Sequence, residues 1–247
     1  MIQALLLDLD DTLLGNDTDT FMKVYFSLLS AYARPYFDEK AFLPPLIAST
    51  EVMMRDINPE LTNAQVFWRS FEAMTGSKRD ELEPFFMRFY NEDFLRLRES
   101  VSVRPAATEL VDMALERNLA VVVATNPLFP SHAIEHRLEW AGLPISQYNF
   151  ALVTHYDNMH AAKPQPAYYQ EILDRIGVRP EHALMVGNDW KNDIDPAAKA
   201  GLYTYWIAAG DDTPPDPTIL HGQGSLDDLA ELVANGWLDE LGAPPSA

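Results

Sequence analysis

Two carboxylates stand where the first apolar run of the sequence ends. The run Ala4-Leu5-Leu6-Leu7 is followed at once by Asp8-Leu9-Asp10. A short apolar run with polar boundaries is typical of a buried strand in a parallel sheet, and ligands bind at the carboxyl ends of such strands. Two neighbouring carboxylates repel each other, and Mg²⁺, which binds one or two carboxylates together with phosphate oxygens, would compensate them. The alternative is an acidic turn after a strand.

Polar residues also follow other apolar runs or begin a helix, so they could lie close to Asp8 and Asp10. Thr125 and Asn126 follow an apolar run, Lys163 stands before a Pro-Gln-Pro segment that opens a helix, and a polar segment, Gly187–Asp193, follows another run. Taken alone, Thr125 is as easily a β-branched residue that ends a strand. A lone lysine such as Lys163 is more often a surface residue.

The periodicity indicates which elements position these residues. After residue 100, apolar runs alternate with helical segments, which is typical of parallel βαβ units. The strands are expected at 4–7, 119–124, 150–154, 183–186 and 203–207, and the helices at 106–118, 131–140, 166–176, 195–200 and 225–234. Between residues 20 and 97 only helical periodicity is found, over 20–32, 39–57, 62–74 and 79–97. A helical insert therefore interrupts an α/β core near Asp8 and Asp10, as a lid would.

Three further segments are expected to lack regular structure. Residues 15–19 are polar and read as a flexible stretch. Residues 210–224 are rich in Pro, Asp and Gly and read as a loop. The tail 242–247 is expected to be disordered.

Composition narrows the class of protein. The 247 residues include 18 Lys and Arg against 37 Asp and Glu, a formal net charge of −19. This charge disfavours a nucleic-acid or anionic-membrane partner. The absence of Cys excludes disulfides and thiol catalysis and fits a reducing compartment. No run approaches the roughly 18 apolar residues that span a membrane, and no signal peptide is evident, so we expect a cytoplasmic protein.

The sequence resembles the haloacid dehalogenase-like (HAD) hydrolase superfamily, whose ordered motifs are DxDx[T/V], a Ser or Thr after a strand, a Lys, and GDxxxD or GDxxxxD. The corresponding residues here are Asp8-x-Asp10-x-Thr12, Thr125, Lys163 and the segment Gly187–Asp193. The resemblance covers nearly the whole chain. It implies a Rossmann-like α/β core of residues 1–16 and 101–247, with residues 17–100 as a helical, C1-type cap. It also implies the phosphatase branch, because the dehalogenase branch lacks the acid at Asp10.

The resemblance implies a role for each motif residue. Asp8 would be the nucleophile that forms an aspartyl-phosphate, since a carboxylate is already ionised at neutral pH. Asp10 would protonate the leaving group and then activate water. Lys163 would neutralise charge on Asp8 and the phosphoryl group. Asp8 and Asp10 would also bind Mg²⁺. The implied phosphate-binding residues are Thr12, Thr125 and Asn126.

The fourth motif departs from the family's commonest form and leaves the last metal ligand open. Gly187 is followed by Asn188, where the family usually has Asp. In the GDxxxD register Asp189 binds the metal, and in the GDxxxxD register the amide oxygen of Asn188 does. Asp189 is preferred because Mg²⁺ favours anionic oxygens, and the two residues could share the ion. Asp193 would orient Lys163 or a metal-bound water.

The aromatic residues of the insert fall at helical spacing, which indicates the packed core of the cap rather than a substrate platform. These residues are Phe67, Trp68, Phe71, Phe85, Phe86, Phe89 and Tyr90. A cap arginine could recognise a phosphate or carboxylate. The candidates are Arg55, Arg69, Arg88, Arg96 and Arg98, and the sequence favours none of them.

The sequence therefore predicts a Mg²⁺-dependent phosphomonoester hydrolase that acts on a small phosphorylated metabolite, as a monomer or homodimer. A phosphomutase or phosphonatase could use the same core. A non-catalytic phosphate-binding module of the receiver type is a further alternative, but its phosphorylated Asp ends the third strand. No Asp ends a predicted strand between Thr12 and Thr125.

Overall fold

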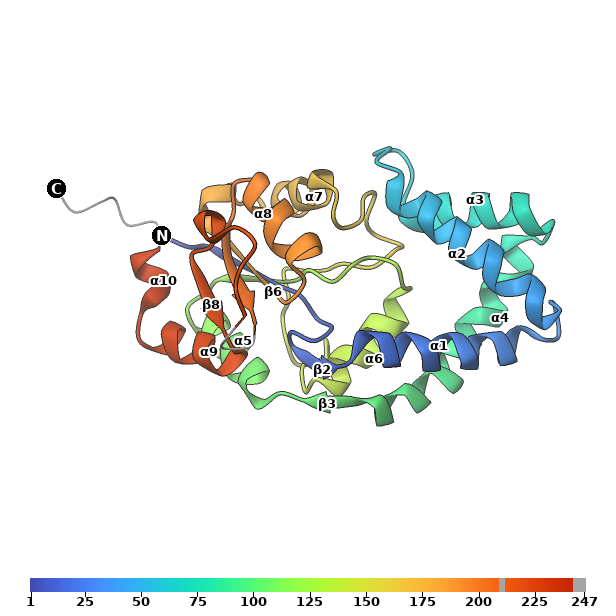
Figure 1. Ribbon diagram of the computed structural model, residues 1–247, viewed down its shortest axis with the longest axis horizontal. Helices are drawn as coiled ribbons and strands as arrows, with labels where there is room; N and C mark the ends of the chain where they lie inside the picture. The colour runs from blue at the N-terminus through green and yellow to red at the C-terminus, as the bar shows by residue number, and fades with distance from the viewer. Residues whose placement is uncertain (209–211, 242–247) are drawn as a thin grey trace.

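A parallel sheet lies at the centre of one half of the molecule, and a group of helices forms the other half (Figure 1). The computed structural model describes residues 1–208 and 212–241. Within these residues the sheet has six strands in the order β5-β4-β1-β6-β7-β8, all parallel to their neighbours. The strands are β1 (Ala4–Leu7), β4 (Ala120–Val123), β5 (Leu152–Val153), β6 (Ala183–Gly187), β7 (Tyr203–Ile207) and β8 (Gly222–Gly224). This is the α/β fold that the alternation of runs predicts.

The register of the three central strands brings the predicted motifs to one edge. Leu7 of β1 is paired with Val123 of β4 and with Val186 of β6. The residues that follow, beginning with Asp8, therefore leave the sheet at the same level, as the carboxyl ends of parallel strands do.

Helices cover both faces of the sheet because the strand residues alternate in direction. Leu5 and Leu7 belong to one apolar cluster, and Ala4 and Leu6 belong to another. The first face is covered by α5 (Pro105–Glu116), α6 (Ser131–Trp140) and α9 (Leu226–Ala234). The second is covered by α7 (Pro166–Ile176) and α8 (Asp195–Lys199). A capping box of Ser225 and Asp228 opens α9, within the helix predicted over 225–234, and a short α10 (Trp237–Glu240) follows it.

The helical insert consists of four α-helices and a 3₁₀ helix. They are α1 (Thr18–Ala33), α2 (Glu39–Arg55), α3 (Asn63–Thr75), α4 (Arg79–Asn91) and the 3₁₀ helix Asp93–Ser100. The last two replace the single helix expected over 79–97. Of the predicted aromatic core, Phe71 and Phe89 are almost fully buried, whereas Phe67 and Tyr90 are half-buried. No helix in the described part of the chain is long and apolar enough to cross a membrane.

Two segments expected to be irregular form strands instead. Residues 14–16 form β2 (Leu14–Asn16), which pairs antiparallel with β3 (Val101–Val103). The stretch is ordered because the two connections between core and insert pair with each other, a contact that local composition cannot indicate. The expected loop 210–224 contains β8 and a 3₁₀ turn, Pro217–Ile219. Residues 210–211 of that loop and the predicted disordered tail 242–247 lie outside the described residues.

Candidate active site

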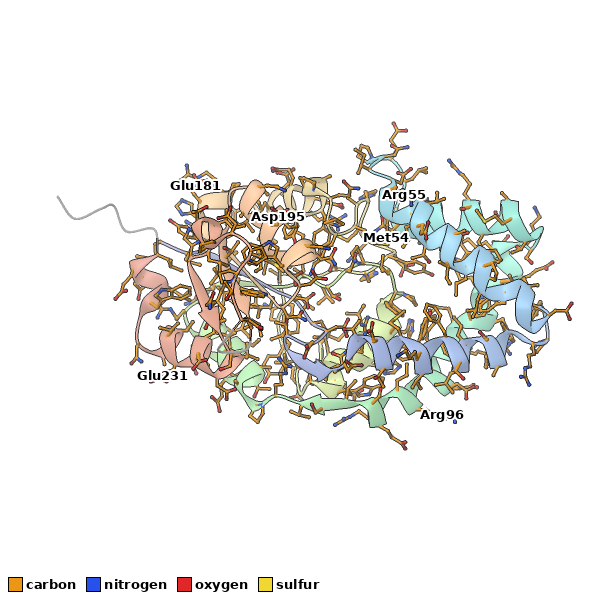
Figure 2. All side chains as sticks on the ribbon, in the orientation of Figure 1. Met54, Arg55, Arg96, Glu181, Asp195 and Glu231 are labelled. Carbon is orange, nitrogen blue, oxygen red and sulfur yellow. The ribbon has the colours of Figure 1, made fainter. Side chains whose placement is uncertain are left out.

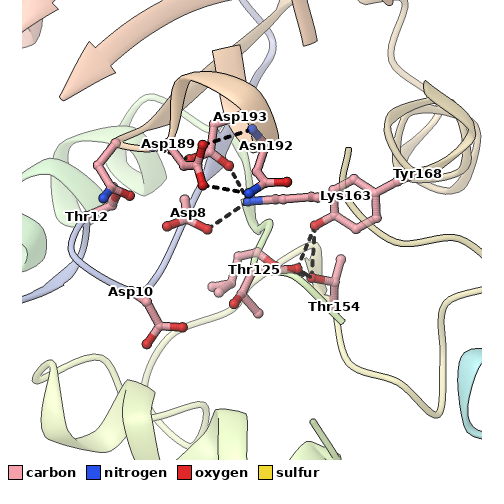
Figure 3. Close-up of polar contacts among 12 residues, drawn as sticks. Asp8, Asp10, Thr12, Thr125, Thr154, Lys163, Tyr168, Asp189, Asn192 and Asp193 are labelled. Atoms are coloured by element: carbon pink, nitrogen blue, oxygen red, sulfur yellow. Dashed lines mark hydrogen bonds and ion pairs between the residues drawn. The ribbon is translucent and has the colours of Figure 1, made fainter. Parts of the chain in front are cut away.

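Lys163 joins two carboxylates at the carboxyl edge of the sheet (Figure 3). Its Nζ donates to Oδ1 of Asp8 at 2.7 Å and to Oδ1 of Asp193 at 2.5 Å. Lys163 and Asp193 are each 1% exposed and Asp8 is 7% exposed. The group therefore places two carboxylates and one ammonium, with a net negative charge, in a site almost closed to solvent.

Burial and ion pairing shift the pKa values of Asp8, Asp193 and Lys163 in opposite directions. Burial raises the pKa of Asp8 to about 7, although the Lys163 ammonium opposes the shift. Burial also raises the pKa of Asp193, again against Lys163. Burial alone would lower the pKa of Lys163, but Asp193 and Asp8 raise it well above its usual value. Lys163 therefore stays charged, and the excess negative charge of the two acids favours a further cation.

Asp193 is held by the turn after β6. Its Oδ2 accepts the backbone N–H of Asp189 at 3.0 Å. A Cβ atom at Gly187 would lie 2.3 Å from Oδ2 of Asp193. Only glycine at 187 lets Asp193 approach the strand end closely enough to reach Lys163.

The two candidates for the fourth-motif metal ligand are placed differently. Asp189 is exposed and caps the π-helical turn Trp190–Ile194. Its Oδ1 accepts the backbone N–H groups of Lys191 and Asn192 at 2.9 and 3.1 Å, and its Oδ2 accepts the side chain of Asn192. Asn188 instead faces the first motif, since Thr12 Oγ1 lies 3.4 Å from its Oδ1.

Asp10 is turned away from Lys163 and towards α6 (Figure 3). Its Oδ2 accepts Nη1 of the buried Arg137 at 2.5 Å. The Arg137 guanidinium lies 4.6 Å from the ring centroid of Phe129, and its Nε donates to the carbonyl of Ala133. The Oδ1 of Asp10 is buried and has no hydrogen-bond partner within the described residues.

Thr125 is fixed through its backbone. The Tyr168 and Thr154 hydroxyls donate to its carbonyl at 2.8 and 2.7 Å (Figure 3). The adjacent Asn126 is half-buried, and its Oδ1 has no hydrogen-bond partner among the described residues. The side chains of Thr125 and Asn126 thus remain available at the end of β4 while their backbone is held.

The loop after β1 is held by residues from both sides of the insert. Asp11 has a left-handed backbone with φ of 56°, and its N–H donates to Oδ1 of Asn16 at 2.7 Å. Arg104 donates to the carbonyls of Asp11 and Thr12 and pairs with the Asp11 carboxylate. These contacts fix the turn that carries Asp10 and Thr12.

Sequence reasoning missed several residues that hold the site. Arg137 lies on a predicted helix with no motif around it, and Arg104 lies before Pro105 at the edge of the core. The pair Tyr168 and Tyr169 begins the helix after Lys163, and Tyr169 donates to the carbonyls of Asn192 and Asp193. Two adjacent aromatic residues after the lysine motif were a weak signal, and the two arginines gave none.

The donor set suits a hard cation. Within the described residues, no cluster of three His, Cys, Asp or Glu side chains is arranged to hold a metal ion. Mg²⁺ needs fewer protein ligands, because it keeps several waters and takes substrate oxygens. Asp8 and Asn188 supply oxygens just after the neighbouring strands β1 and β6, next to a buried group that has two carboxylates and one ammonium. These residues therefore fit Mg²⁺.

A family model, haloacid dehalogenase-like hydrolase, matches residues 2–201. The chain belongs to this family. It is therefore a hydrolase, and the motifs that carried the sequence resemblance lie within the matched region. This HAD hydrolase is 29% identical to a phosphoserine phosphatase of Thermus thermophilus, over 85% of its own length and 90% of the relative's.

Two further proteins place this HAD hydrolase among its relatives. It is 34% identical to a phosphoglycolate phosphatase of Rhodospirillum rubrum over 59% of each chain. Its fold is similar to that of a 2-haloacid dehalogenase from Pseudomonas syringae, with a TM-score of 0.62, 22% identity and coverage of 95% and 99% of the two chains. The structural likeness concerns the fold alone.

Proposed function

We propose that this HAD hydrolase is a Mg²⁺-dependent phosphatase that hydrolyses a small phosphomonoester through a phosphorylated Asp8. The observation that carries the proposal is the Asp8–Lys163–Asp193 group at the carboxyl edge of β1 and β6. The presence of Asp10 and the names of the two phosphatase relatives support phosphate chemistry over dehalogenation.

In the first step, an Asp8 oxygen attacks phosphorus and the bond to the leaving oxygen breaks. Asp10 gives a proton to that oxygen. In the second step, water attacks phosphorus, Asp10 takes the proton of the water, and the bond from phosphorus to Asp8 breaks. Arg137 holds Oδ2 of Asp10 at 2.5 Å, and Oδ1 of Asp10, which has no hydrogen-bond partner among the described residues, is left to give the proton in the first step and to accept it in the second.

Lys163 holds the reacting oxygen of Asp8 and stabilises the charge that develops on the phosphoryl group. Thr125 and Asn126 would donate to phosphoryl oxygens from the end of β4. Mg²⁺, when bound, would stabilise charge on the transferring group. We assign its ligands to Asp8, the backbone or side chain of Asp10, and Asn188. Asn188 is favoured over Asp189 because the Asp189 carboxylate is already used as a helix cap: it accepts the backbone N–H groups of Lys191 and Asn192 and the side chain of Asn192.

The test is phosphate release from methyl phosphate and p-nitrophenyl phosphate, with Mg²⁺ or with EDTA. We expect Mg²⁺-dependent turnover, and Asp8→Asn should lower it by at least about 10⁴-fold. Asp195→Asn is the matched control, because Asp195 pairs on the surface with Lys199, and it should retain full activity. Activity that survives Asp8→Asn would contradict the mechanism.

A further inference from the structure

A cavity of about 250 Å³ lies between the helical insert and the loop that follows β4. Aromatic and Met side chains from α1, α2, α3 and α4 make up most of its wall, and residues 128–130 close it on the side of the core. Figure 2 shows Met54, one of the lining residues, at the end of α2 nearest the sheet. Ligand pockets have volumes of about 300 Å³ upwards, so this cavity has room for one part of a small molecule.

The cavity wall continues directly from the phosphate-binding residues of the proposed site. Leu128 and Phe129 line the cavity, and they follow Thr125 by three and four residues. Three residues of extended chain span at most about 11 Å. Phe129 lies between the two regions, because one of its neighbours is Arg137, which binds Asp10, and another is Tyr25 of the cavity wall.

The insert is fixed to the same loop at the start of α3. The buried Asn63 donates from Nδ2 to the carbonyls of Pro127 and Ala161, at 3.3 and 3.2 Å. Its N–H donates to the carbonyl of Met159 at 2.7 Å. Ala161 stands two residues before Lys163, so these bonds hold the cavity close to both the second and the third motif.

Charge and hydrogen bonding decide what the cavity accepts. Among the described lining residues there is no Lys or Arg. The two lining carboxylates have basic partners, Glu83 in two bonds of 2.8 Å from Arg79 and Glu51 in a contact of 3.3 Å with Arg55. The Tyr25 and Tyr90 hydroxyls bond to each other at 2.9 Å. A second anionic group on the substrate would therefore find no cation among these residues, whereas an apolar group would contact the aromatic and Met side chains that make up most of the wall. The buried Nε1 of Trp68 has no hydrogen-bond partner among the described residues and is the donor left for a neutral polar atom.

We propose that this cavity binds an uncharged, apolar leaving group of the phosphomonoester substrate. The proposal rests on the phosphatase function and adds the substrate class. Phosphoserine and phosphoglycolate, for which two relatives are named, carry a carboxylate, and this hydrolase is expected to discriminate against such substrates.

The first test compares kcat/KM for methyl, n-propyl and n-hexyl phosphate with that for phosphoglycolate, in the full-length protein with Mg²⁺. Burial of each added methylene should raise kcat/KM about fourfold until the cavity is filled. Phosphoglycolate should be a poorer substrate than n-propyl phosphate. A flat series, or a preference for phosphoglycolate, would overturn the proposal while leaving the phosphatase function intact.

The second test fills the cavity. Thr50→Phe and Met54→Trp place bulk into its wall, and either should lower the ratio of kcat/KM for hexyl over methyl phosphate by at least about tenfold. Val52→Phe is the control, because Val52 lies on the same helix, is 43% exposed and does not line the cavity. An unchanged ratio in a folded Thr50→Phe or Met54→Trp variant would overturn the proposal.

Binding of 1-naphthol, followed by its fluorescence, measures the cavity without turnover. If no ester is hydrolysed, the phosphatase proposal fails. Naphthol binding then still tests, independently of turnover, whether the cavity binds an apolar group. Naphthol binding in the wild type and in Val52→Phe that is lost in Thr50→Phe or Met54→Trp supports an apolar site. Absence of binding in the wild type, or equal binding in all variants, overturns it.

Discussion

The carboxyl edge of the sheet and the cavity of the insert are built from opposite kinds of contact. At the edge, Lys163 is bonded to two carboxylates, and backbone groups fix Asp193 and Thr125. In the cavity, aromatic rings such as Phe42 and Phe86 contact each other, with centroids 5.6 Å apart. The edge depends on single charges and precise distances, whereas the cavity depends on shape. Reaction chemistry should therefore be sensitive to one atom at the edge, and specificity to volume in the insert.

The largest effect is expected at the buried ion pair. Lys163→Met leaves Asp8 and Asp193 without their cation, and it should lower turnover by about 10³-fold and the free energy of unfolding by about 3 kcal/mol. Turnover and urea unfolding at pH 7.5 measure the two effects. Lys199→Met breaks an exposed ion pair with Asp195 and should change stability by less than about 0.5 kcal/mol. If Lys163→Met and Lys199→Met lowered the free energy of unfolding equally, the buried ion pair at the edge would be no more important for stability than the exposed pair.

The pH dependence of stability tests whether burial opposes the ionisation of Asp8 at the carboxyl edge of the sheet. Burial raises the pKa of folded Asp8 to about 7, above its unfolded value of about 4. The unfolded chain therefore binds fewer protons at this residue, and the contribution of Asp8 to stability falls as pH rises from 4 to 7. In EDTA, the free energy of unfolding of Asp8→Asn minus that of the wild type should increase by about 2 kcal/mol between pH 5 and 8.

Chemical unfolding at a series of pH values measures this difference. Asp195→Asn, at an exposed ion pair, is the control and should show a constant difference from the wild type over the same range. A constant difference for Asp8→Asn as well would mean that burial does not oppose its ionisation.

Because the side chain of Asn188 is a neutral amide, replacing it with a carboxylate should strengthen Mg²⁺ binding at the carboxyl edge of the sheet. Asn188→Asp adds an anionic oxygen beside Thr12 and should tighten Mg²⁺ binding by about tenfold. Asp189→Asn, in the residue that caps Trp190–Ile194, should leave Mg²⁺ binding within about twofold of the wild type. Isothermal titration with Mg²⁺ measures both. A loss of affinity in Asp189→Asn larger than any gain in Asn188→Asp would assign the metal ligand to Asp189.

The smallest expected effect is a difference in unfolding free energy between substitutions of a fully packed ring and of a ring that lines the cavity. Phe89 is fully buried, contacts Tyr25 and Tyr32, and does not line the cavity. Phe89→Leu should cost about 1.5 kcal/mol of unfolding free energy. Phe86 lines the cavity, so Phe86→Leu removes fewer contacts and should cost about half as much. Equal costs would show that the two rings are equally well packed.

The same contrast explains what could be predicted from the sequence. Short apolar runs ending in polar residues predicted β1, β4 and β6, because strand ends in a parallel sheet share one edge. Asp8 and Lys163, 155 residues apart, could be assigned to one site only through the family resemblance. Both registers of the fourth motif fit the sequence, and the proposal of Asn188 over Asp189 rests on the turn geometry.

Other features could not be predicted because distant segments create them. β2 and β3 are three-residue strands joined across the whole insert, and β8 is a Gly-rich segment ordered by pairing with β7. The role of Arg137 in the site depends on its bond to Asp10, which is 127 residues away in the sequence. The cavity was also beyond prediction: helical spacing indicated that Trp68 and Phe71 are buried, but not that they leave a space between them and the loop after β4.

Trapping the phosphorylated protein tests the proposed role of Asp8 most directly. The wild type is mixed with methyl phosphate and Mg²⁺, quenched in acid within milliseconds, digested and analysed by mass spectrometry. The proposed mechanism predicts one phosphorylated peptide, modified at Asp8, that forms before phosphate is released and is absent from Asp8→Asn. Rapid hydrolysis without a phosphorylated peptide, or a modification at another residue, would contradict it.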